Sequence, residues 1–395
     1  MNFGIICEFN PFHAGHKYLF DKAREFGAKN IVCAMSGNAV QRGEFAFIDK
    51  YSRARGALQN GADLVLELPF PWSSASAEYF AMAGIKALVP YCDAIIFGSE
   101  CGNIEILYSA AEKALTSEFC DEFERRKKSG EGAAAAYFDL LQENLSIKLS
   151  SNDILGIEYI KAAKKIGAGL KFYTVRRMGG SYRDNNICDG KIPSASAIRG
   201  VFQNGDTESF LKLQPYTEDI VKNELNKGLI TDFKLLERAY LMYFRLSDAS
   251  ELSNYAEAEG GVAERICAAA RENADFESFW QAVKTKRYTD AKLNRAMLFC
   301  ITKVKRELLL QAPEYLYLLA ANENGRKLLA TVKKSGDDKD NKDNKSIFIV
   351  TKPADVPRNS PQFLAEERLN AVFSLAMTNA LPMGDAYKKN AFVIK

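Results

Sequence analysis

The chain has 395 residues, of which 47% are hydrophobic and 26% are charged, and its formal net charge is +3. This length exceeds what one hydrophobic core usually supports and predicts two or three domains. The composition is ordinary for a soluble globular protein, and no apolar run approaches the ~20 residues needed to cross a bilayer. The small net charge neither requires nor excludes a nucleic-acid partner, so any basic surface must be local.

The eight cysteines are scattered and form no C-x-x-C pair. Because the chain has only two histidines, no plausible zinc-binding set is present, and we expect no metal held by protein side chains. Cys7, Cys33 and Cys300 lie in apolar runs, where a reduced thiol packs as a small hydrophobic group. Met1 leads directly into a predicted strand, without a signal peptide. We therefore expect a reduced, soluble, cytoplasmic protein.

The first half of the chain alternates short apolar runs with helical patterns, which is typical of a parallel sheet covered on both faces. The predicted strands are Phe3–Phe9, Asn30–Met35, Leu64–Leu68, Ala94–Phe97 and Leu170–Val175. The predicted helices between them are Lys17–Phe26, Lys50–Asn60, Ala75–Leu88, Ile104–Ala114 and Ile154–Lys165. We therefore expect an α/β, Rossmann-like domain with its ligand-binding residues at the carboxyl ends of the strands.

The pattern changes after about residue 210. Residues 218–311 have long helical periodicity and few strand signals, which predicts a helical domain. From Pro313 onward, two predicted strands flank a helix and indicate a small α+β region; they are Glu314–Leu319, Ser346–Val350 and the helix Asn324–Val332. The mixed-charge run 333–345 is most simply a solvated, mobile loop. The predicted domains are thus 1–210, 211–312 and 313–395.

Both histidines lie in one phrase, Asn-Pro-Phe-His-Ala-Gly-His at 10–16, between the first predicted strand and the first predicted helix. A helix start offers unpaired N–H groups and a positive dipole end to an anion. Gly15 allows close approach of the backbone, and imidazoles at His13 and His16 can stabilise charge on a phosphoryl group. The alternative is two ordinary histidines that lie together by chance. The strand, H-x-G-H turn and helix favour a nucleotide phosphate site.

A second phosphate-binding candidate is Pro-Ser-Ala-Ser-Ala-Ile-Arg at 193–199, where a helix is expected to begin. The hydroxyls of Ser194 and Ser196 can cap that helix or donate to phosphate oxygens. Arg199, one turn later, can reach the same oxygens with its guanidinium. The simpler alternative is an ordinary serine cap with a surface arginine, and the H-x-G-H phrase favours the functional interpretation.

Two further clusters follow predicted strands. Arg176 and Arg177, then Met178 and two glycines, suit an anion or the face of a nucleobase, although an exposed basic turn has the same composition. The stretch 35–44, Met-Ser-Gly-Asn-Ala-Val-Gln-Arg-Gly-Glu, is too long and glycine-rich for a tight turn and is a candidate site loop.

A basic face is predicted on the helical segment 290–310. Lys292, Arg295, Phe299, Lys303 and Arg306 recur at helical spacing, and Lys286 and Arg287 precede them. Cations fit phosphates, and an aromatic ring can stack on an unpaired base. Such a face is more often only solvated, but beside an adenylating domain it favours RNA binding.

Together these phrases resemble the tRNA(Met) cytidine acetate ligase family of the H-x-G-H nucleotidyltransferase superfamily. The resemblance covers nearly the whole chain and rests on the matching phrases at 4–6, 8–16, 35–37, 41–44, 61–69, 97–100, 152–156, 177–179, 194–199, 286–289, 293–295 and 322–326. It implies an enzyme that activates acetate with ATP, which releases pyrophosphate. It then transfers the acetyl group to the 4-amino group of the wobble cytidine of elongator tRNA(Met), which releases AMP.

The resemblance also implies which residues serve ATP, with Mg²⁺ accompanying the nucleotide. His13 and His16 would be catalytic. The nucleotide-binding set would comprise Ile6, Cys7, Glu8, Phe9, Asn10, Pro11, Phe12, His13, Gly15, His16, Lys17, Gly98, Gly102, Asn152, Arg177, Met178, Ser194, Ser196 and Arg199. The candidate tRNA-binding residues remain Lys286, Arg287, Lys292, Arg295, Lys303 and Arg306.

Three other functions stay open on the residues alone. An adenylyltransferase that makes a nucleotide coenzyme from ATP and a small phosphate ester shares both phosphate motifs, but rarely needs so much additional chain. A class I aminoacyl-tRNA synthetase is disfavoured because we find no K-M-S-K-S sequence. A non-catalytic RNA adaptor would bind ATP without releasing pyrophosphate. No motif identifies the acid that is activated.

Overall fold

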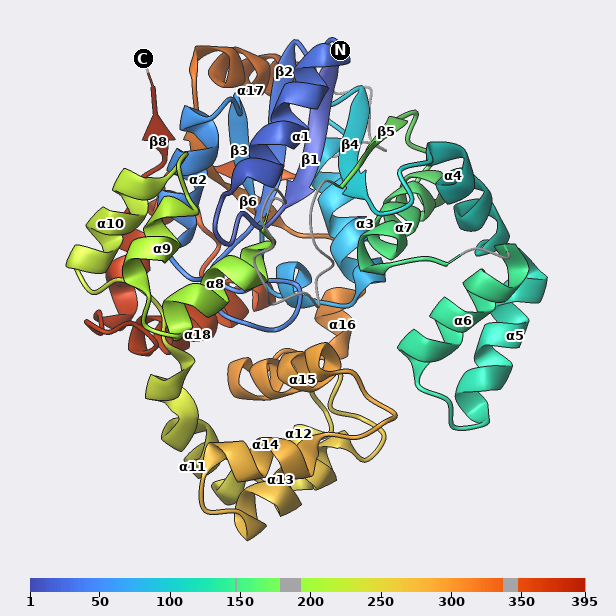
Figure 1. Cartoon of the computed structure of the whole chain (residues 1–395), viewed down its shortest axis with the longest axis vertical. Coiled ribbons are helices and arrows are strands. Elements are labelled where there is room, and N and C mark those ends of the chain that lie inside the picture. The colour runs from blue at the N-terminus through green and yellow to red at the C-terminus, as the bar shows by residue number, and fades with distance from the viewer. Residues whose placement is uncertain (146–147, 178–192, 337–346, 395) are drawn as a thin grey trace.

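An eight-stranded, mostly parallel sheet forms the centre of the computed structural model, which describes residues 1–145, 148–177, 193–336 and 347–394 (Figure 1). Met178 and most of the charged run 333–345 lie outside these residues. The strand order is β5-β4-β1-β2-β3-β6-β7, and β8 pairs with β6. The strands are β1 Asn2–Cys7, β2 Asn30–Ser36, β3 Leu64–Leu68, β4 Ala94–Ser99, β5 Lys171–Arg176, β6 Tyr315–Ala321, β7 Phe348–Val350 and β8 Phe392–Val393.

Alternate residues of the central strands feed two hydrophobic cores, one on each face of the sheet. Phe3 and Ile5 of β1 pack in one core, and Ile6 packs in the other. Helices α1 (Ala14–Glu25) and α2 (Lys50–Gln59) cover the first face. Helices cover the second face as well, namely α3 Ala77–Leu88, α4 Ile104–Lys113, α7 Ser151–Lys165 and α17 Glu323–Gly336. The predicted α/β fold with both faces covered is confirmed.

The chain order of the strands reverses beside β1. From β1 the chain adds β2 and then β3 on one side, all parallel, and it later adds β4 and β5 on the other side. Open α/β sheets bind their ligands outside the carboxyl ends of the strands at such a reversal, and we refer to the region beyond the carboxyl ends of β1 and β4 as the crevice. The H-x-G-H phrase follows β1 directly.

The C-terminal region completes this sheet and does not form a separate layer. Strand β6 runs antiparallel to β3, with Leu64 opposite Ala321, and β7 and β8 both pair with β6. The predicted boundary at 313 therefore separates strands of one sheet. Local sequence patterns reveal a strand but not its partner, so a pairing between residues this far apart was not predictable.

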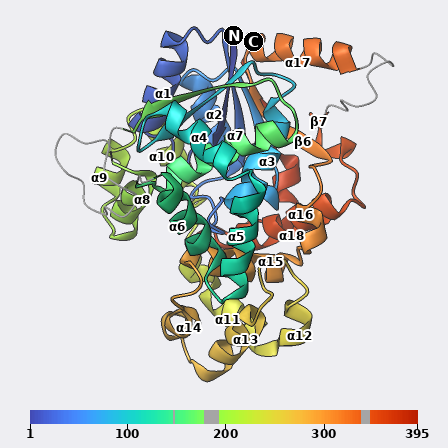
Figure 2. The same ribbon diagram turned by 90° about the vertical axis from the view of Figure 1, so that its right-hand side faces the viewer.

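The remaining helices form three groups. Helices α5 (Ser117–Lys128) and α6 (Ala133–Leu145), which the sequence did not predict, form a hairpin that projects from the sheet (Figures 1 and 2). The helices α8 Ala195–Gln203, α9 Thr207–Lys212 and α10 Glu218–Asn226 share one small core, so the predicted boundary at 210 falls inside it. The helical unit comprises α11 Glu237–Leu246, α12 Ala249–Leu252, α13 Val262–Glu272, α14 Phe276–Val283, α15 Asp290–Thr302 and α16 Arg306–Leu309.

Helix α18 (Pro361–Leu375) returns from the sheet to pack against α15, and this contact joins the helical unit to the rest of the protein. The hairpin turn also reaches the helical unit, because Gly132 lies so close to the carbonyl oxygen of Arg287 that a Cβ there would overlap it. Within the described ranges, no helix is long and apolar enough to cross a membrane.

Candidate active site

The two histidines cap helix α1 with their own rings. His13 is the N-cap residue, and its Nδ1 accepts the backbone N–H of Gly15 at 3.0 Å. The Nδ1 of His16 accepts the backbone N–H of His13 at 3.2 Å, which closes a reciprocal capping box. An imidazole nitrogen that accepts an N–H carries no hydrogen, so in each neutral ring the hydrogen lies on Nε2. The ring centroids lie 3.9 Å apart.

Both imidazoles are neutral at physiological pH. Burial, together with a smaller contribution from the positive charge of Arg177, lowers the pKa of His13 to about 3. Burial and the neighbouring His13 ring also bring the pKa of His16 well below its usual value. Each ring therefore offers an uncharged Nε2–H donor. Such donors can stabilise charge that develops on a phosphoryl oxygen without a proton being taken up first.

The chain immediately before the histidines is held in an unusual conformation by aromatic packing. Phe9 has a φ of +47°, a left-handed conformation that costs a bulky residue of the order of 1–3 kcal/mol. Its ring is fully buried and lies 5.1 Å from Phe12, 4.9 Å from His16 and 5.7 Å from Phe20, measured between centroids. These ring contacts fix the turn between β1 and α1 and thereby aim the imidazoles.

A buried arginine that the sequence analysis missed ties this turn to the next strand. Arg53 of α2 is only 2% exposed. Its guanidinium donates to the carbonyl oxygen of Glu8 at 2.6 Å, that of Ser36 at 3.1 Å and that of Gly37, while its Nε donates to the Ile48 oxygen at 3.0 Å. The carboxyl ends of β1 and β2 are thereby held to the start of α2.

The end of β4 forms the opposite border of the crevice. Asp153, fully buried at the start of α7, accepts the hydroxyl of Ser99 at 2.7 Å and the backbone N–H of Cys101 at 3.1 Å. The Ser99 hydroxyl accepts the N–H of Gly102 at 2.9 Å. These bonds shape the turn in which Gly102 has a φ of +61°, and a Cβ there would lie 2.8 Å from the Arg176 side chain. Asp153 is a positioning residue that the sequence analysis did not single out.

Arg177 and Asn152 meet on Glu100 in the same crevice. Asn152 donates to Glu100 Oε1 at 2.6 Å, and Nε of Arg177 lies 3.5 Å from the same oxygen. The Arg177 side chain is 38% exposed, and its charge lowers the pKa of both histidines. Arg177 and Asn152 therefore lie together on Glu100, and Arg177 is near enough to the histidines to act on them electrostatically.

The downstream serine–arginine motif also reaches the H-x-G-H turn. Ser194 caps α8 by accepting the N–H of Ala197 at 3.2 Å, and its hydroxyl lies 3.1 Å from that of Ser196. Arg199 donates to the carbonyl oxygen of Asn10 at 2.7 Å and contacts Glu44 at 3.2 Å. Arg199 therefore joins the start of α8 to the turn that precedes the histidines.

Several other residues of the predicted nucleotide-binding set are placed away from the crevice by their side chains. Ile6 and Cys7 are buried in the two cores of the sheet. Lys17 is paired with Asp21 one turn along α1. Glu8 accepts the N–H of Gln41 at 2.8 Å, and burial raises the pKa of its carboxyl.

The predicted basic face on the helical unit is wrong as a continuous exposed stripe. Phe299 is fully buried, and the Arg295 side chain is 9% exposed, with two hydrogen bonds of 2.8 Å to Glu257. Helix α15 ends at Thr302, and Lys303 caps it with a φ of +56°. Lys286, Arg287, Lys303 and Arg306 are exposed, and Lys292 is partly exposed. Helical spacing identifies a face but not its surroundings, so the buried partner of Arg295 was not foreseeable.

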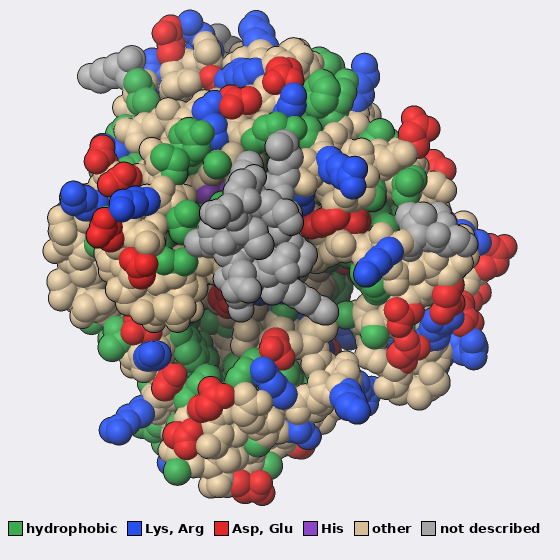
Figure 3. Space-filling model, in the orientation of Figure 1, with side chains coloured by type: hydrophobic (Ala, Val, Ile, Leu, Met, Phe, Trp, Pro, Cys, Tyr) green, Lys and Arg blue, Asp and Glu red, His purple; other side chains and the backbone are tan. Residues whose placement is uncertain are grey.

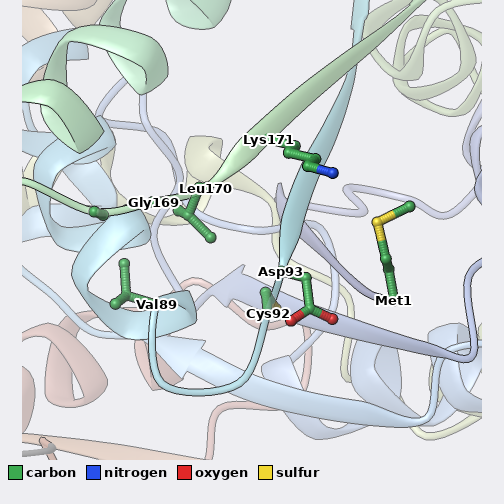
Figure 4. Close-up of a pocket in the computed structure, with 8 residues that line it drawn as sticks. Met1, Val89, Cys92, Asp93, Gly169, Leu170 and Lys171 are labelled. Atoms are coloured by element: carbon green, nitrogen blue, oxygen red, sulfur yellow. The ribbon is translucent and has the colours of Figure 1, made fainter.

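A separate pocket lies at the amino ends of the strands, opposite the ends that the histidines follow. It is lined by Met1, Val89, Cys92, Asp93, Ala168, Gly169, Leu170 and Lys171, which precede or begin β1, β4 and β5 (Figure 4). These residues lie at the amino ends of the strands, whereas the histidines follow the carboxyl end of β1. The pocket is therefore distinct from the crevice beside the histidines. Among the described residues, no group of three or more His, Cys, Asp or Glu side chains could hold a metal ion.

Comparison with known proteins decides the family. The HIGH Nucleotidyl Transferase family model matches residues 1–381. The chain is 32% identical to the tRNA(Met) cytidine acetate ligase of Clostridium perfringens, over 85% of this chain and 87% of that one. It is 30% identical to the enzyme of the same name from Clostridium botulinum strain Langeland, over 99% and 98% of the two chains. The chain belongs to the tRNA(Met) cytidine acetate ligase family of HIGH nucleotidyltransferases.

Solved structures show the same architecture. Thermotoga maritima TmcAL bound with alpha-thio ATP superposes with a TM-score of 0.87 at 28% sequence identity, and the match covers 100% of both chains. The form without ligand superposes with a TM-score of 0.88 at the same identity and coverage. The likeness therefore extends beyond the nucleotidyltransferase sheet to the helical unit and the C-terminal strands.

The neutral state of the two rings gives a direct test. In protein labelled with ¹³C and ¹⁵N at histidine, only His13 and His16 contribute imidazole signals, provided no histidine tag is present. Because both pKa values are lowered, we expect neither ring to titrate between about pH 8 and pH 5, whereas an unperturbed histidine titrates near 6.5. The ¹⁵N shifts should show the Nε2–H tautomer for both. A midpoint near 6.5 for either ring would contradict the assignment.

Proposed function

We propose that this protein is an ATP-dependent ligase that forms acetyl-adenylate and transfers its acetyl group to the 4-amino group of the wobble cytidine of elongator tRNA(Met) in the cytoplasm. The relatives named tRNA(Met) cytidine acetate ligase support this function. The observation that carries it is the pair of neutral Nε2–H donors, with Arg199 bound to the same turn. ATP is the substrate, and Mg²⁺ accompanies its phosphates.

In the first step a carboxylate oxygen of acetate attacks the α-phosphorus, and the bond to the pyrophosphate oxygen breaks. His13 and His16 donate Nε2–H bonds to phosphoryl oxygens, and their strength rises as charge develops there. Ser194, Ser196 and Arg199 bind the outer phosphates, and Arg177 adds positive charge beside the histidines. Because the imidazoles are already neutral, they stabilise this step by hydrogen bonding and need not exchange a proton.

In the second step the 4-amino nitrogen attacks the acetyl carbonyl carbon, AMP departs, and the nitrogen loses one proton. The tRNA must therefore reach the crevice at the carboxyl edge of the sheet. In the space-filling view this face of the molecule shows histidine surface near its centre and is hollowed between the helical unit and the α5–α6 hairpin (Figure 3). Lys286, Arg287, Lys292, Lys303 and Arg306 of the helical unit supply cations for tRNA phosphates, whereas Arg295 has a structural role with Glu257.

The first test measures acetate-dependent exchange of labelled pyrophosphate into ATP. His16→Ala should slow exchange by ~10²–10³, the usual effect of losing one preorganised donor. Wild-type protein should exchange with acetate, less with larger acids and not at all without acid. Exchange that persists in His16→Ala would remove the histidine from the mechanism. Exchange without acid, or with a phosphate ester alone, would instead favour the coenzyme adenylyltransferase.

The second test separates tRNA binding from adenylation. Replacing Lys286 and Arg287 with Gln should reduce the salt slope of tRNA binding by about two units or less, because at most two phosphate contacts are lost. Pyrophosphate exchange without tRNA should be unchanged. The matched control replaces Lys164 and Lys165, an exposed pair at the end of α7, and should leave both measurements unchanged. A loss of exchange in the Lys286/Arg287 variant would place these side chains in support of the fold.

Arg295 is expected to behave differently from the exposed cations. Arg295→Ala leaves the carboxylate of Glu257 in a mostly buried site without its partner, which typically costs about 3–5 kcal/mol. We therefore expect a lower melting temperature and parallel losses of adenylation and tRNA binding. Lowered tRNA affinity with unchanged thermal stability would instead show that Arg295 contacts the tRNA.

A further inference from the structure

The arginine that the proposed function assigns to ATP phosphates already has an anionic partner. Nη2 of Arg199 lies 3.2 Å from Oε2 of Glu44, and Nη1 donates to the Asn10 carbonyl oxygen at 2.7 Å. The side chains of Arg199 and Glu44 are 18% and 39% exposed. A phosphate that binds Arg199 from the crevice must therefore share the guanidinium with a carboxylate or displace it. The first arrangement would place two anions side by side, which is unfavourable in a partly desolvated site.

The turn that carries Glu44 is held from two sides. Within the turn, the backbone N–H of Val40 donates to the backbone carbonyl oxygen of Glu44 at 2.9 Å. The N–H of Gly43 donates to the carbonyl oxygen of Val40, also at 2.9 Å. On one side the Gln41 N–H donates to Glu8, directly after β1. On the other side Gly43, with a φ of +75°, lies so close to α15 that a Cβ would be 2.5 Å from the backbone nitrogen of Arg295. The turn therefore connects the nucleotide crevice to the helical unit.

We infer that Glu44 is a positioning residue that holds Arg199 in a resting state, and that ATP phosphates displace it, so that nucleotide binding moves the turn 40–44 against α15. This inference rests on the proposed function, in which Arg199 binds phosphate. Asn10 keeps its bond to the other guanidinium nitrogen, so Arg199 stays anchored while its second partner changes. Because the turn lies directly on the backbone of α15, displacement of Glu44 changes the contact between this turn and the helical unit.

The test is the dissociation constant for ATP, measured by calorimetry without acetate or tRNA. Removing the competing charge in Glu44→Gln should tighten ATP binding about two- to fivefold, at the upper end of the range for ion pairs near the surface, because this pair is only partly exposed. A merely structural role for Glu44 would weaken binding instead. Glu44→Asp should restore an intermediate affinity, and Glu208→Gln, in the exposed pair with Lys212 on α9, should leave it unchanged. Unchanged or weaker binding in Glu44→Gln overturns the inference.

The double variant distinguishes this inference from the proposed function. If Arg199→Gln weakens ATP binding and Glu44→Gln adds no gain in its presence, Glu44 acts through Arg199. If Arg199→Gln has no effect on ATP binding, both the phosphate role of Arg199 and the inference are wrong. If Arg199→Gln weakens ATP binding but Glu44→Gln does not tighten it, the phosphate role of Arg199 in the proposed function is retained and the inference about Glu44 is wrong.

Hydrogen exchange tests the connection to the helical unit. ATP should change the exchange rates of amides in α15 (Asp290–Thr302) in wild-type protein. The change should be smaller in Glu44→Gln, because the variant no longer releases a paired carboxylate when ATP binds. Equal changes in both proteins would show that Glu44 does not carry the signal.

Discussion

The buried guanidinium of Arg53 is the interaction on which the arrangement of this site depends. It donates to carbonyl oxygens at the end of β1, at the end of β2 and in the segment before α2. The carbonyls of Glu8, Ser36 and Gly37 lie at or directly after the ends of β1 and β2, where the chain leaves the sheet, and that of Ile48 lies two residues before α2. Hydrogen bonds from a charged donor contribute about 1.5–3 kcal/mol each, and an abandoned buried carbonyl costs about 1–3 kcal/mol. Arg53 therefore stabilises a loop junction that hydrophobic packing alone would leave unsatisfied.

The position of this arginine has electrostatic consequences. Burial lowers the pKa of Arg53 to about 10, and the neighbouring Asp49 opposes that shift. Asp49 also caps α2 by accepting the N–H groups of Tyr51 and Ser52 at 2.7 and 3.0 Å. The next residue, Lys50, is buried against Glu67 of β3 at 2.5 Å. The start of α2 thus fixes the ends of three adjacent strands, and the loops after β1 and β2 border the proposed nucleotide site.

Much of the fold was predictable because the central strands are short apolar runs that end in polar turns. All five expected strands of the first half were found, and β3 has the predicted bounds Leu64–Leu68. The pair His13 and His16 was also visible, since two rare residues beside a glycine at a strand end have few structural explanations. The hydrogen-bond and ion-pair partners that depend on the tertiary fold could not be predicted. Arg53, Asp153 and Glu44 are ordinary charged residues in the sequence, and only the packing of distant segments gives them their bonds.

The basic segment of α15 illustrates the same limit. Arg295 and Phe299 have the spacing of one helical face, but the turn containing Gly43 and the loop containing Glu257 lie over Arg295, and Phe70 packs against Phe299. A pattern of period 3.6 fixes which residues lie together and leaves open whether water, protein or RNA lies over them. Here the protein itself lies over Arg295 and Phe299, and the backbone of α15 at Arg295 supports the turn that contains Gly43.

In this site the histidines offer uncharged hydrogen-bond donors and the arginines supply the positive charge, and this division suits the proposed first step. Acetate and ATP are both anions, so their approach requires cations, and in the proposed step Arg177, directly after β5, and Arg199 of α8 provide them. If the histidines were also charged, they would bind pyrophosphate tightly after the step. Burial keeps both rings neutral, and Phe9 and Phe12 pack against the ring of His16. The imidazoles can therefore respond to charge as it develops, while the arginines on separate elements can give up their contacts when pyrophosphate leaves.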